Sequence, residues 1–286
     1  MSKRFPPAKL NWSLQVLGRR SDGFHELCSW FFAIDWRDCL RAQPAPRAGL
    51  VVTGPEAATA PPGDNLVLRA EAAWRQAGGQ APCVRWTLTK EIPAGTGLGG
   101  GSSDAVAALQ LLQELATQPL AEQDCLAVAA AIGSDLPYFL TAIQAELRGG
   151  RGEQVLARAP APVVTVLVAV PPFPVATAAV YAALDAPAYA GAAGPAPERE
   201  PSGRPGPNDL EAAAHRAYPE LAAFAATLRE HDDFHMSGSG GAYFAAFVRF
   251  AEAETSAASL RGVLPAGTRL RIAKPCALRF VPGRTA

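Results

Sequence analysis

Features typical of disulfide-linked and metal-binding proteins are nearly missing from this sequence of 286 residues. Its five cysteines are odd in number, widely spaced and without a Cys-x-x-Cys pair, so we expect reduced thiols rather than a disulfide framework. Its four histidines are scattered and form no His-x-x-x-His pattern. A structural zinc site is therefore not expected, and we predict no metal held by protein side chains alone.

Long apolar runs and an excess of one charge are missing too. The best apolar run, residues 163–170, is suited to a buried strand and not to a bilayer span, and the first residues lack the apolar core of a signal peptide. Lysine and arginine number 26, as do aspartate and glutamate, so the formal net charge is 0. We therefore expect a cytoplasmic protein with a small-molecule substrate, no nucleic-acid or membrane partner, and a monomeric or weakly dimeric state.

The most informative segment present is the glycine-rich stretch 93–104, Pro-Ala-Gly-Thr-Gly-Leu-Gly-Gly-Gly-Ser-Ser-Asp. An alternating run at 84–89 predicts a strand before it, and residues 105–115 predict a helix after it. Glycine lets backbone N–H groups approach an anion closely, and the positive end of the following helix faces the same place. The stretch therefore predicts a cradle for phosphates, most simply those of a nucleotide.

Two familiar phosphate-binding motifs do not explain this stretch. Gly95, Gly97 and Gly100 match Gly-x-Gly-x-x-Gly, but residues 117–132 are mostly helical where a dinucleotide fold needs a second strand with an acidic end. The sequence also has no Gly-Lys-Ser/Thr, so a Walker A loop is absent. Two interpretations remain: a phosphate-binding loop of another type, or a loop that binds nothing. The second is less favourable, because ordering such a glycine-rich loop without a ligand costs conformational entropy.

The rest of the chain predicts strands and helices in mixed order, without a regular βαβ rhythm. Strands or apolar runs are expected at 8–17, 27–34, 163–170, 242–248 and 270–273, and a further helix at 126–132, ending at Gly133. The segment 186–207 is rich in Pro, Ala and Gly and predicts a flexible surface loop. Asn208 and Glu211 predict a capping box that opens one helix reaching about Arg229.

Two charged residues are suited to phosphoryl transfer near the glycine-rich stretch. Asp135 follows a Gly-Ser turn and can accept a hydroxyl proton. Lys9, in the first predicted strand, can stabilise negative charge and keep that carboxylate ionised. Each also has an ordinary interpretation, Asp135 as a helix N-cap and Lys9 as a solvated surface lysine, so the pair needs support from other motifs.

The segment Asp22-Gly23-Phe24-His25 combines a turn with an aromatic ring and an imidazole. Phe24 can stack on a nucleobase, and His25 can bind the edge of the base. The alternative interpretation is a packed aromatic residue beside an exposed loop histidine.

Taken together, the motifs resemble one family, the GHMP kinases. Its motifs occur in order as Pro7-Ala8-Lys9-Leu10-Asn11, the stretch 93–103, and Met236-Ser237-Gly238-Ser239-Gly240. Within the family, the chain resembles the branch that phosphorylates a cytidine-diphosphate-linked methylerythritol. That likeness lies in Asp22-Gly23-Phe24-His25, Asp64-Asn65-Leu66, Gly99-Gly100-Gly101, Gly133-Ser134-Asp135-Leu136-Pro137 and Asn208-Asp209-Leu210-Glu211. The resemblance spans nearly the whole chain.

The resemblance implies an α+β fold of two domains with the active site in the cleft between them. We place an ATP-binding domain at 1–160 and a C-terminal domain at 161–286. The resemblance also implies ATP as the phosphoryl donor, with Mg²⁺ carried mainly on its phosphates, and a 2-hydroxyl as the acceptor.

The residues that match the family's catalytic pair are Lys9 and Asp135. The implied ATP site comprises Asn65, Leu66, Lys90, Pro93, Gly95, Gly97, Leu98, Gly99, Gly100, Gly101, Ser102, Ser103 and Asp104, and the implied substrate site comprises Asn11, Phe24, His25, Thr177 and Tyr181. Two departures stand out. Phe24 replaces the usual tyrosine and keeps its stacking face. The segment 186–207 is longer than expected, so the resemblance does not fix where the lid over the substrate lies.

Three other functions compete with this one. Another GHMP kinase, such as homoserine or mevalonate kinase, has no use for a base-binding pair at Phe24 and His25. A dinucleotide-dependent oxidoreductase lacks its second strand with an acidic end. A nucleotide-binding module without catalysis would leave Lys9 and Asp135 without a role.

Overall fold

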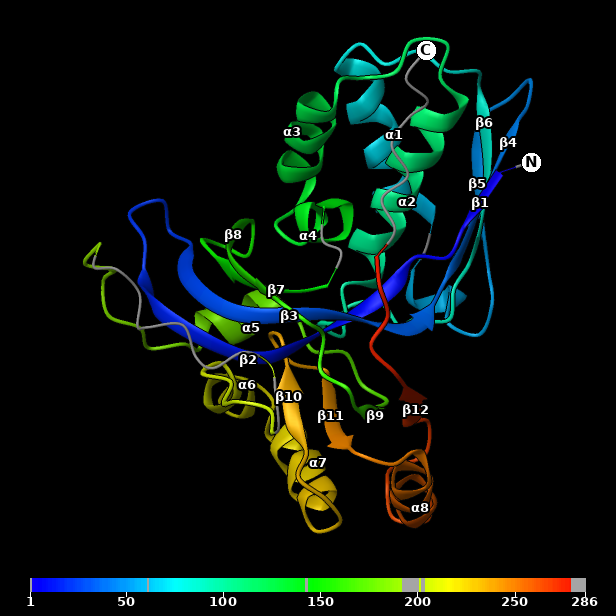
Figure 1. The fold of residues 1–286 in the computed structure, drawn as a ribbon. Helices are drawn as coiled ribbons and strands as arrows, with labels where there is room; N and C mark the ends of the chain where they lie inside the picture. Colours follow the sequence, from blue (N-terminus) through cyan, green and yellow to red (C-terminus); the bar gives the residue numbers. More distant parts are fainter. Residues whose placement is uncertain (1, 61, 142–143, 192–200, 202–203, 279–286) are drawn as a thin grey trace.

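A computed structural model describes residues 2–60, 62–141, 144–191, 201 and 204–278. The described chain forms three four-stranded sheets with helices packed on two of them. A long hairpin of two strands crosses the middle of the molecule, with one helical lobe above it and a sheet and further helices below it (Figure 1). The mixed order of strands and helices confirms the α+β class.

The middle sheet has the order β2-β3-β7-β8, with all neighbours antiparallel. Its strands are β2 (Pro7–Arg19), β3 (His25–Arg37), β7 (Ala145–Gly149) and β8 (Gln154–Ala159). The predicted strand 8–17 and apolar run 27–34 are confirmed. The observed strands are longer than predicted, because both continue toward the hairpin turn that joins them. The hairpin turn is fixed by Asp22, whose Oδ1 accepts the Phe24 N–H at 3.1 Å.

The upper lobe packs a sheet against helices. The sheet has the order β1-β4-β6-β5, and its strands are β1 (Ser2–Arg4), β4 (Cys39–Pro44), β5 (Gly49–Thr53) and β6 (Val84–Thr89). Two short 3₁₀ turns (Ala57–Thr59 and Pro62–Asp64) precede the helices α1 (Leu66–Gln76), α2 (Gly100–Leu115), α3 (Glu122–Ile132) and α4 (Leu136–Thr141). Helix α2 is buried along most of its length, so it is the central element of this lobe.

The lower part is a second α and β layer. Its sheet has the order β10-β11-β9-β12, with β9 (Thr165–Val170), β10 (His235–Ser237), β11 (Ala242–Phe247) and β12 (Arg269–Ala273) all antiparallel to their neighbours. The helices here are α5 (Thr177–Ala182), α6 (Glu211–Ala217), α7 (Pro219–Arg229) and α8 (Phe250–Leu260). The predicted strands at 163–170, 242–248 and 270–273 are confirmed within two residues at each end.

The predicted single helix after Asn208 is wrong, and so is its capping box. The structure has two helices, α6 and α7, that break at Tyr218, because the residue before a proline is disfavoured in the helical region. Asn208 lies outside α6 and donates to the carbonyl oxygens of Met236 and Gly238 at 2.9 and 2.8 Å. Its Oδ1 accepts the Leu210 N–H at 3.0 Å, so the amide holds the turn before α6 against the small-residue loop after β10, without the predicted partner Glu211.

The predicted flexible loop at 186–207 falls partly outside the described residues, which omit 192–200 and 202–203. Its two described flanks pair with β2. The Arg19 N–H donates to Pro187 O at 2.7 Å, and the Leu14 N–H donates to Pro207 O at 2.9 Å. Both ends of the segment are thus held along one strand.

One hydrophobic core joins the two halves of the chain. Trp30 and Phe32 of β3 pack in one buried cluster with Val166 and Val168 of β9 and Phe244 of β11. The upper and lower layers are therefore fixed against each other through the middle sheet. Among the described helices, none has the length and apolar character that a bilayer crossing requires.

A buried charge cluster links β6 to α2 in the upper lobe. The Lys90 ammonium contacts the carboxylates of Asp38 and Asp104, and the Lys90–Asp104 distance is 2.8 Å. Asp38 in turn accepts the Glu91 and Ile92 N–H groups at 2.6 and 2.8 Å. Burial raises the pKa of Asp104 to about 8, against the attraction of Lys90 and with added repulsion from Asp38.

We predict that Lys90→Ala lowers the free energy of unfolding by about 3–5 kcal/mol, because two buried carboxyl groups lose their only shared cation among the described residues. The loss should be smaller well below the Asp104 pKa of about 8, where that carboxyl is protonated and needs no cation. Denaturant unfolding at acidic and alkaline pH measures both effects. Lys274→Ala, at an exposed lysine, is the control and should change little.

Candidate active site

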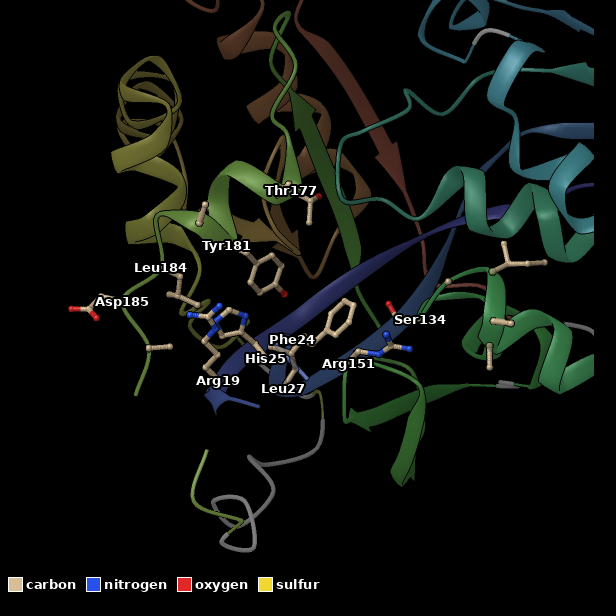
Figure 2. A pocket seen from close by; sticks show the side chains of 18 residues that line it. Arg19, Phe24, His25, Leu27, Ser134, Arg151, Thr177, Tyr181, Leu184 and Asp185 are labelled. Carbon is tan, nitrogen blue, oxygen red and sulfur yellow. The ribbon is translucent and has the colours of Figure 1, made fainter. Parts of the chain in front are cut away.

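An outer cleft of about 990 Å³ lies at the end of the β2–β3 hairpin. Phe24 and His25 come from the hairpin, Tyr181 comes from α5, and Ser134 comes from the turn before α4 (Figure 2). The sequence segments that carry these side chains are far apart, and the middle sheet brings them together. The cleft therefore gathers the predicted aromatic and imidazole groups in one place.

The rings in the outer cleft are arranged for stacking. His25 and Tyr181 stack with centroids 5.1 Å apart and planes at 27°. Phe24 is 52% exposed, so one broad apolar face is open to a ligand. Burial lowers the pKa of His25, and the charge of Arg19 lowers it further. The imidazole is therefore neutral at pH 7 and offers one donor and one acceptor.

A smaller cavity of about 300 Å³ lies deeper in the cleft and contains the predicted catalytic pair. The Lys9 Nζ lies 3.8 Å from Asp135 Oδ2 and donates to Asn11 Oδ1 at 2.6 Å. Its ammonium also lies 4.9 Å from the centre of the Phe31 ring. Burial lowers the pKa of Lys9, while the Asp135 carboxylate opposes that change. The interpretation of Lys9 as a solvated surface lysine is therefore wrong.

Asn11 lies in this inner cavity and not beside Phe24 and His25, with which the sequence grouped it. Its Oδ1 accepts from Lys9, and its Nδ2 donates to Ser29 Oγ at 2.8 Å. Its backbone N–H donates to Ser237 Oγ at 3.0 Å. Asn11 is thus placed to orient Lys9.

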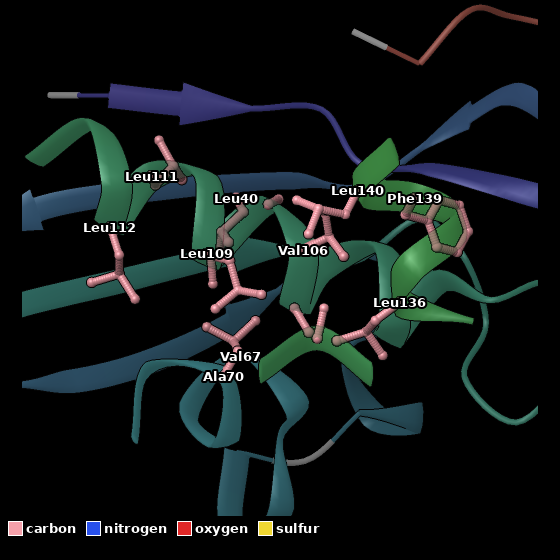
Figure 3. Close-up of a cluster of buried hydrophobic side chains, with 14 of the residues drawn as sticks. Leu40, Val67, Ala70, Val106, Leu109, Leu111, Leu112, Leu136, Phe139 and Leu140 are labelled. Atoms are coloured by element: carbon pink, nitrogen blue, oxygen red, sulfur yellow. The ribbon is translucent and has the colours of Figure 1, made fainter. Parts of the chain in front are cut away.

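Asp135 is held at the edge of the cavity by the packing of α4. Leu136, Phe139 and Leu140 of that helix pack with α2 in the core of the upper lobe (Figure 3). The side chain of Asp135 is 29% exposed, so it reaches into the cleft while the residues after it are anchored. The carboxylate therefore has a fixed position and access to a ligand.

A third cavity, of about 320 Å³, follows the glycine-rich stretch. It is lined by most of the predicted nucleotide residues, namely Asn65, Leu66, Lys90, Pro93, Gly95, Gly97, Gly99, Gly100, Gly101, Ser102 and Asp104. The side chains of Leu98 and Ser103 do not line it and are buried instead, at 0% and 2% exposure. Helix α2 begins at Gly100, earlier than the predicted 105, so its N-terminal N–H groups lie in the cradle itself.

The two small-residue loops touch, and glycine is required where they do. A Cβ at Gly97, whose φ is +75°, would lie 2.9 Å from Ser237 O. A Cβ at Gly241, whose φ is +90°, would lie 3.0 Å from the Thr96 Cα. The loop before α2 and the loop after β10 therefore close one side of the cleft by backbone contact.

The three cavities form one continuous path. Gly97 and Ser102 line both the inner cavity and the glycine-rich cavity. The inner cavity and the outer cleft share Leu27, Gly133, Ser134, Arg151, Thr177 and Tyr181. A group held at the glycine-rich stretch can thus meet a hydroxyl held at Asp135, while the rest of the acceptor extends to the aromatic rings.

Several residues of this path are not in the sequence-based predictions. Asp38 holds Lys90, and it stands at a strand end, where no motif marks it. Arg151 lines two of the cavities, and its only signal is the turn sequence Gly-Gly-Arg-Gly between two strands. Ser239 is part of a quoted motif, and its Oγ lies 2.7 Å from the Thr177 Oγ1. Among the described residues, no cluster of three or more His, Cys, Asp or Glu side chains is arranged to hold a metal.

Comparison with known proteins follows the same motifs. The model of the GHMP kinases N terminal domain matches residues 65–142. The 4-diphosphocytidyl-2-C-methyl-D-erythritol kinase of Caulobacter vibrioides is 36% identical over 276 residues, which cover 91% of this chain and 95% of that protein. The enzyme of the same name from Thermus thermophilus is 39% identical over 252 residues, covering 85% and 86%.

Solved structures show the same likeness. A crystal structure of 4-(cytidine 5'-diphospho)-2C-methyl-D-erythritol kinase matches with a TM-score of 0.73 and 32% identity, over 96% of this chain and 100% of that one. Homoserine kinase from Cytophaga hutchinsonii has a TM-score of 0.61 at 16% identity, with 97% and 95% covered, which is a likeness of fold alone.

Proposed function

Because the chain belongs to the 4-diphosphocytidyl-2-C-methyl-D-erythritol kinase family of the GHMP kinases, we propose that it transfers the γ-phosphoryl group of ATP to the 2-hydroxyl of 4-diphosphocytidyl-2-C-methyl-D-erythritol. The products are the 2-phosphate and ADP, in the non-mevalonate pathway of isoprenoid precursor synthesis. The observation that carries the proposal is the continuous path of three cavities, which suits a base, a reacting hydroxyl and a phosphate donor in that order.

On the acceptor side, we assign Asp135 as the group that accepts or orients the hydroxyl proton. The Lys9 ammonium, 3.8 Å away, keeps the carboxylate ionised and stabilises charge on the transferring group. Asn11 fixes the direction of the ammonium through its 2.6 Å hydrogen bond. The cluster is largely buried, so these charges act with little screening by water.

On the donor side, the glycine-rich stretch and the N-terminus of α2 hold the ATP phosphates through backbone N–H groups. Asn65 and Leu66 line the same cavity toward the adenosine. The Lys90 ammonium, assigned from the sequence to the nucleotide, already contacts the carboxyl groups of Asp38 and Asp104 and acts as a support beneath the cradle.

Mg²⁺ fits this cavity as a cation that stays with the phosphates. It keeps several waters and needs only one or two oxygen ligands from a protein. Ser102 lines the cavity with a hydroxyl oxygen, and the carboxyl group of Asp104 lies beneath it, with a buried Oδ1 that has no hydrogen-bond partner among the described residues. The ion would supply positive charge for the phosphates, and the chain's own part is to hold those phosphates in line with Asp135.

On the base side, Phe24 and Tyr181 provide stacking faces, and neutral His25 provides a donor and an acceptor for the cytosine edge. Thr177 lies between the base and the hydroxyl, on the wall of both cavities.

We also propose a domain boundary at 160/161. It lies in the connection between β8, which ends at Ala159, and β9, which begins at Thr165.

The reaction is tested by ADP release with candidate acceptors. The cytidine-diphosphate-linked methylerythritol should be phosphorylated, while homoserine and mevalonate should not. A preference for a plain alcohol would assign the chain to another branch of the GHMP kinases, and Phe24 and His25 would then serve packing only.

We predict that Asp135→Asn keeps the fold and the ATP affinity but lowers kcat by about 10²–10⁴-fold, since an amide cannot accept the hydroxyl proton. Steady-state kinetics and ATP calorimetry measure the two effects. Asp124→Asn makes the same change on the surface of α3 and should retain normal turnover. Near-normal kcat in the Asp135 variant would contradict the assigned role.

We predict that Lys9→Ala lowers kcat by about 10²–10³-fold, because charge on the transferring group loses a preorganised donor. In the wild-type enzyme, activity should also fall on the alkaline side below the ordinary lysine range, since burial lowers the pKa of Lys9. The residual activity of the variant should lack this alkaline decline. A pH profile of kcat for both proteins tests this, and the same decline in both would remove Lys9 from the chemistry.

We predict that Phe24→Ala and His25→Ala raise the KM for the cytidine substrate about 10–100-fold and leave ATP binding alone, because stacking and an edge hydrogen bond are each worth about 1–3 kcal/mol. Phe5→Ala is the matched control, because Phe5 is 50% exposed and lies outside all three cavities. Normal KM in both cleft variants would place the base elsewhere.

A further inference from the structure

We propose that Glu56 and Arg269 are positioning residues for the nucleotide: their ion pair ties the wall of the glycine-rich cavity to the lower sheet and holds that wall in the shape that binds ATP. Glu56 directly precedes the first 3₁₀ turn of the upper lobe, and Arg269 is the first residue of β12. The inference rests on the proposed function, because it takes this cavity as the ATP site. Neither residue belongs to a motif of the sequence.

The two side chains meet in a bidentate contact between the upper lobe and the lower sheet. Arg269 Nε donates to Glu56 Oε1 at 2.7 Å, and Arg269 Nη2 donates to Glu56 Oε2 at 2.9 Å. Glu56 is only 6% exposed, and Arg269 is its one ion-pair partner in the part of the chain that the structure describes. Two parallel hydrogen bonds fix the direction of the carboxylate as well as its distance from the guanidinium.

The backbone of Glu56 supports the wall of the glycine-rich cavity. Its carbonyl oxygen accepts the Thr59 hydroxyl at 2.7 Å, and its N–H donates to Lys90 O at 3.1 Å. The Thr59 Oγ1 in turn accepts the Ala94 N–H at 3.1 Å. Thr59, Lys90 and Ala94 all line the cavity. A shift of Glu56 therefore reaches three residues of the wall through hydrogen bonds.

Arg269 is anchored independently of the upper lobe. It pairs in register with Val170 of β9, an interior strand of the lower sheet whose six residues are all buried. Its Nη1 also donates to Gly267 O at 3.2 Å. The guanidinium thus has a fixed origin in a packed sheet, while Glu56 lies in the connection between β5 and α1. The sheet therefore positions the connection through this pair.

Loss of the guanidinium leaves a buried carboxylate without its cation. An unpaired buried charge is costly, so the Glu56 side chain turns toward water and strains the hydrogen bonds to Thr59 and Lys90. Asn65 and Leu66, assigned to the adenosine, line the same cavity as Thr59. The displaced wall then binds any adenosine phosphate less tightly, whereas the acceptor cavities are lined by other elements and keep their shape.

Calorimetry with ATP and with ADP tests the positioning role. We expect Arg269→Ala to raise both Kd values about 5–20-fold, and Arg269→Lys to raise them less, because lysine keeps the charge and loses the bidentate geometry. Arg269→Ala should have a smaller effect in a Glu56→Gln background, where no buried charge is left unpaired. Arg271→Ala is the matched control, because Arg271 is an exposed residue of the same strand outside the three cavities.

Steady-state kinetics separates positioning from a purely structural ion pair. In Arg269→Ala the KM for ATP should rise, while kcat at saturating ATP and the KM for the acceptor stay within about twofold. A lower free energy of unfolding with an unchanged ATP Kd would overturn the proposal, and so would an equal loss of acceptor affinity. Either result leaves the proposed function standing if wild-type protein binds ATP and phosphorylates the acceptor. If wild-type protein does neither, the proposed function fails first.

Discussion

Backbone contact at the start of helix α2 sets the geometry of the whole cleft. A Cβ at Gly99 would lie 3.0 Å from Lys9 Cγ and from the Phe139 ring, and one at Gly100 would lie 2.9 Å from Ile92 Cγ2. Only glycine permits this approach, so the helix terminus lies directly against the strand that carries Lys9. The Lys9 N–H also donates to Leu98 O at 2.9 Å, so close packing and a backbone hydrogen bond set the separation between the phosphate cradle and the inner cavity, which suits a reaction that depends on positioning.

Three cations of the cleft differ because their partners differ. Lys90 is buried between the carboxyl groups of Asp38 and Asp104, which occupy its ammonium group. Lys9 faces one carboxylate at 3.8 Å and a neutral amide at 2.6 Å, so much of its charge is available to an anion. Arg151 lies over an aromatic ring and has no ion pair among the described residues. The positive charge that is free to meet an anion is therefore smallest at Lys90, larger at Lys9 and largest at Arg151.

The sequence predicted the family, the α+β class and most residues of the cradle, because these depend on glycine spacing and short local motifs. It did not predict the break at Tyr218, where Pro219 overrides a continuous helical pattern. It also did not predict the ion-pair cluster of Lys90 with Asp38 and Asp104, because these partners lie 52 and 14 positions away in the sequence. Asn11 was grouped with the base, and no local pattern shows its partners: Ser29 reaches it through the pairing of β2 with β3, and Ser237 reaches it when β10 packs on β2.

The order of the cavities also explains how the nucleotide part of the acceptor can promote turnover. A plain alcohol fits the inner cavity of about 300 Å³ but leaves the outer cleft of about 990 Å³ without a ligand. On the proposed assignment, the base meets Phe24, His25 and Tyr181 in the outer cleft, away from the reacting hydroxyl at Asp135 in the inner cavity. Binding energy from such a remote group offsets the entropy of fixing the hydroxyl at Asp135, so removing the base costs kcat as well as affinity. Selectivity for a cytidylated alcohol and positioning for phosphoryl transfer therefore have the same physical origin in this cleft.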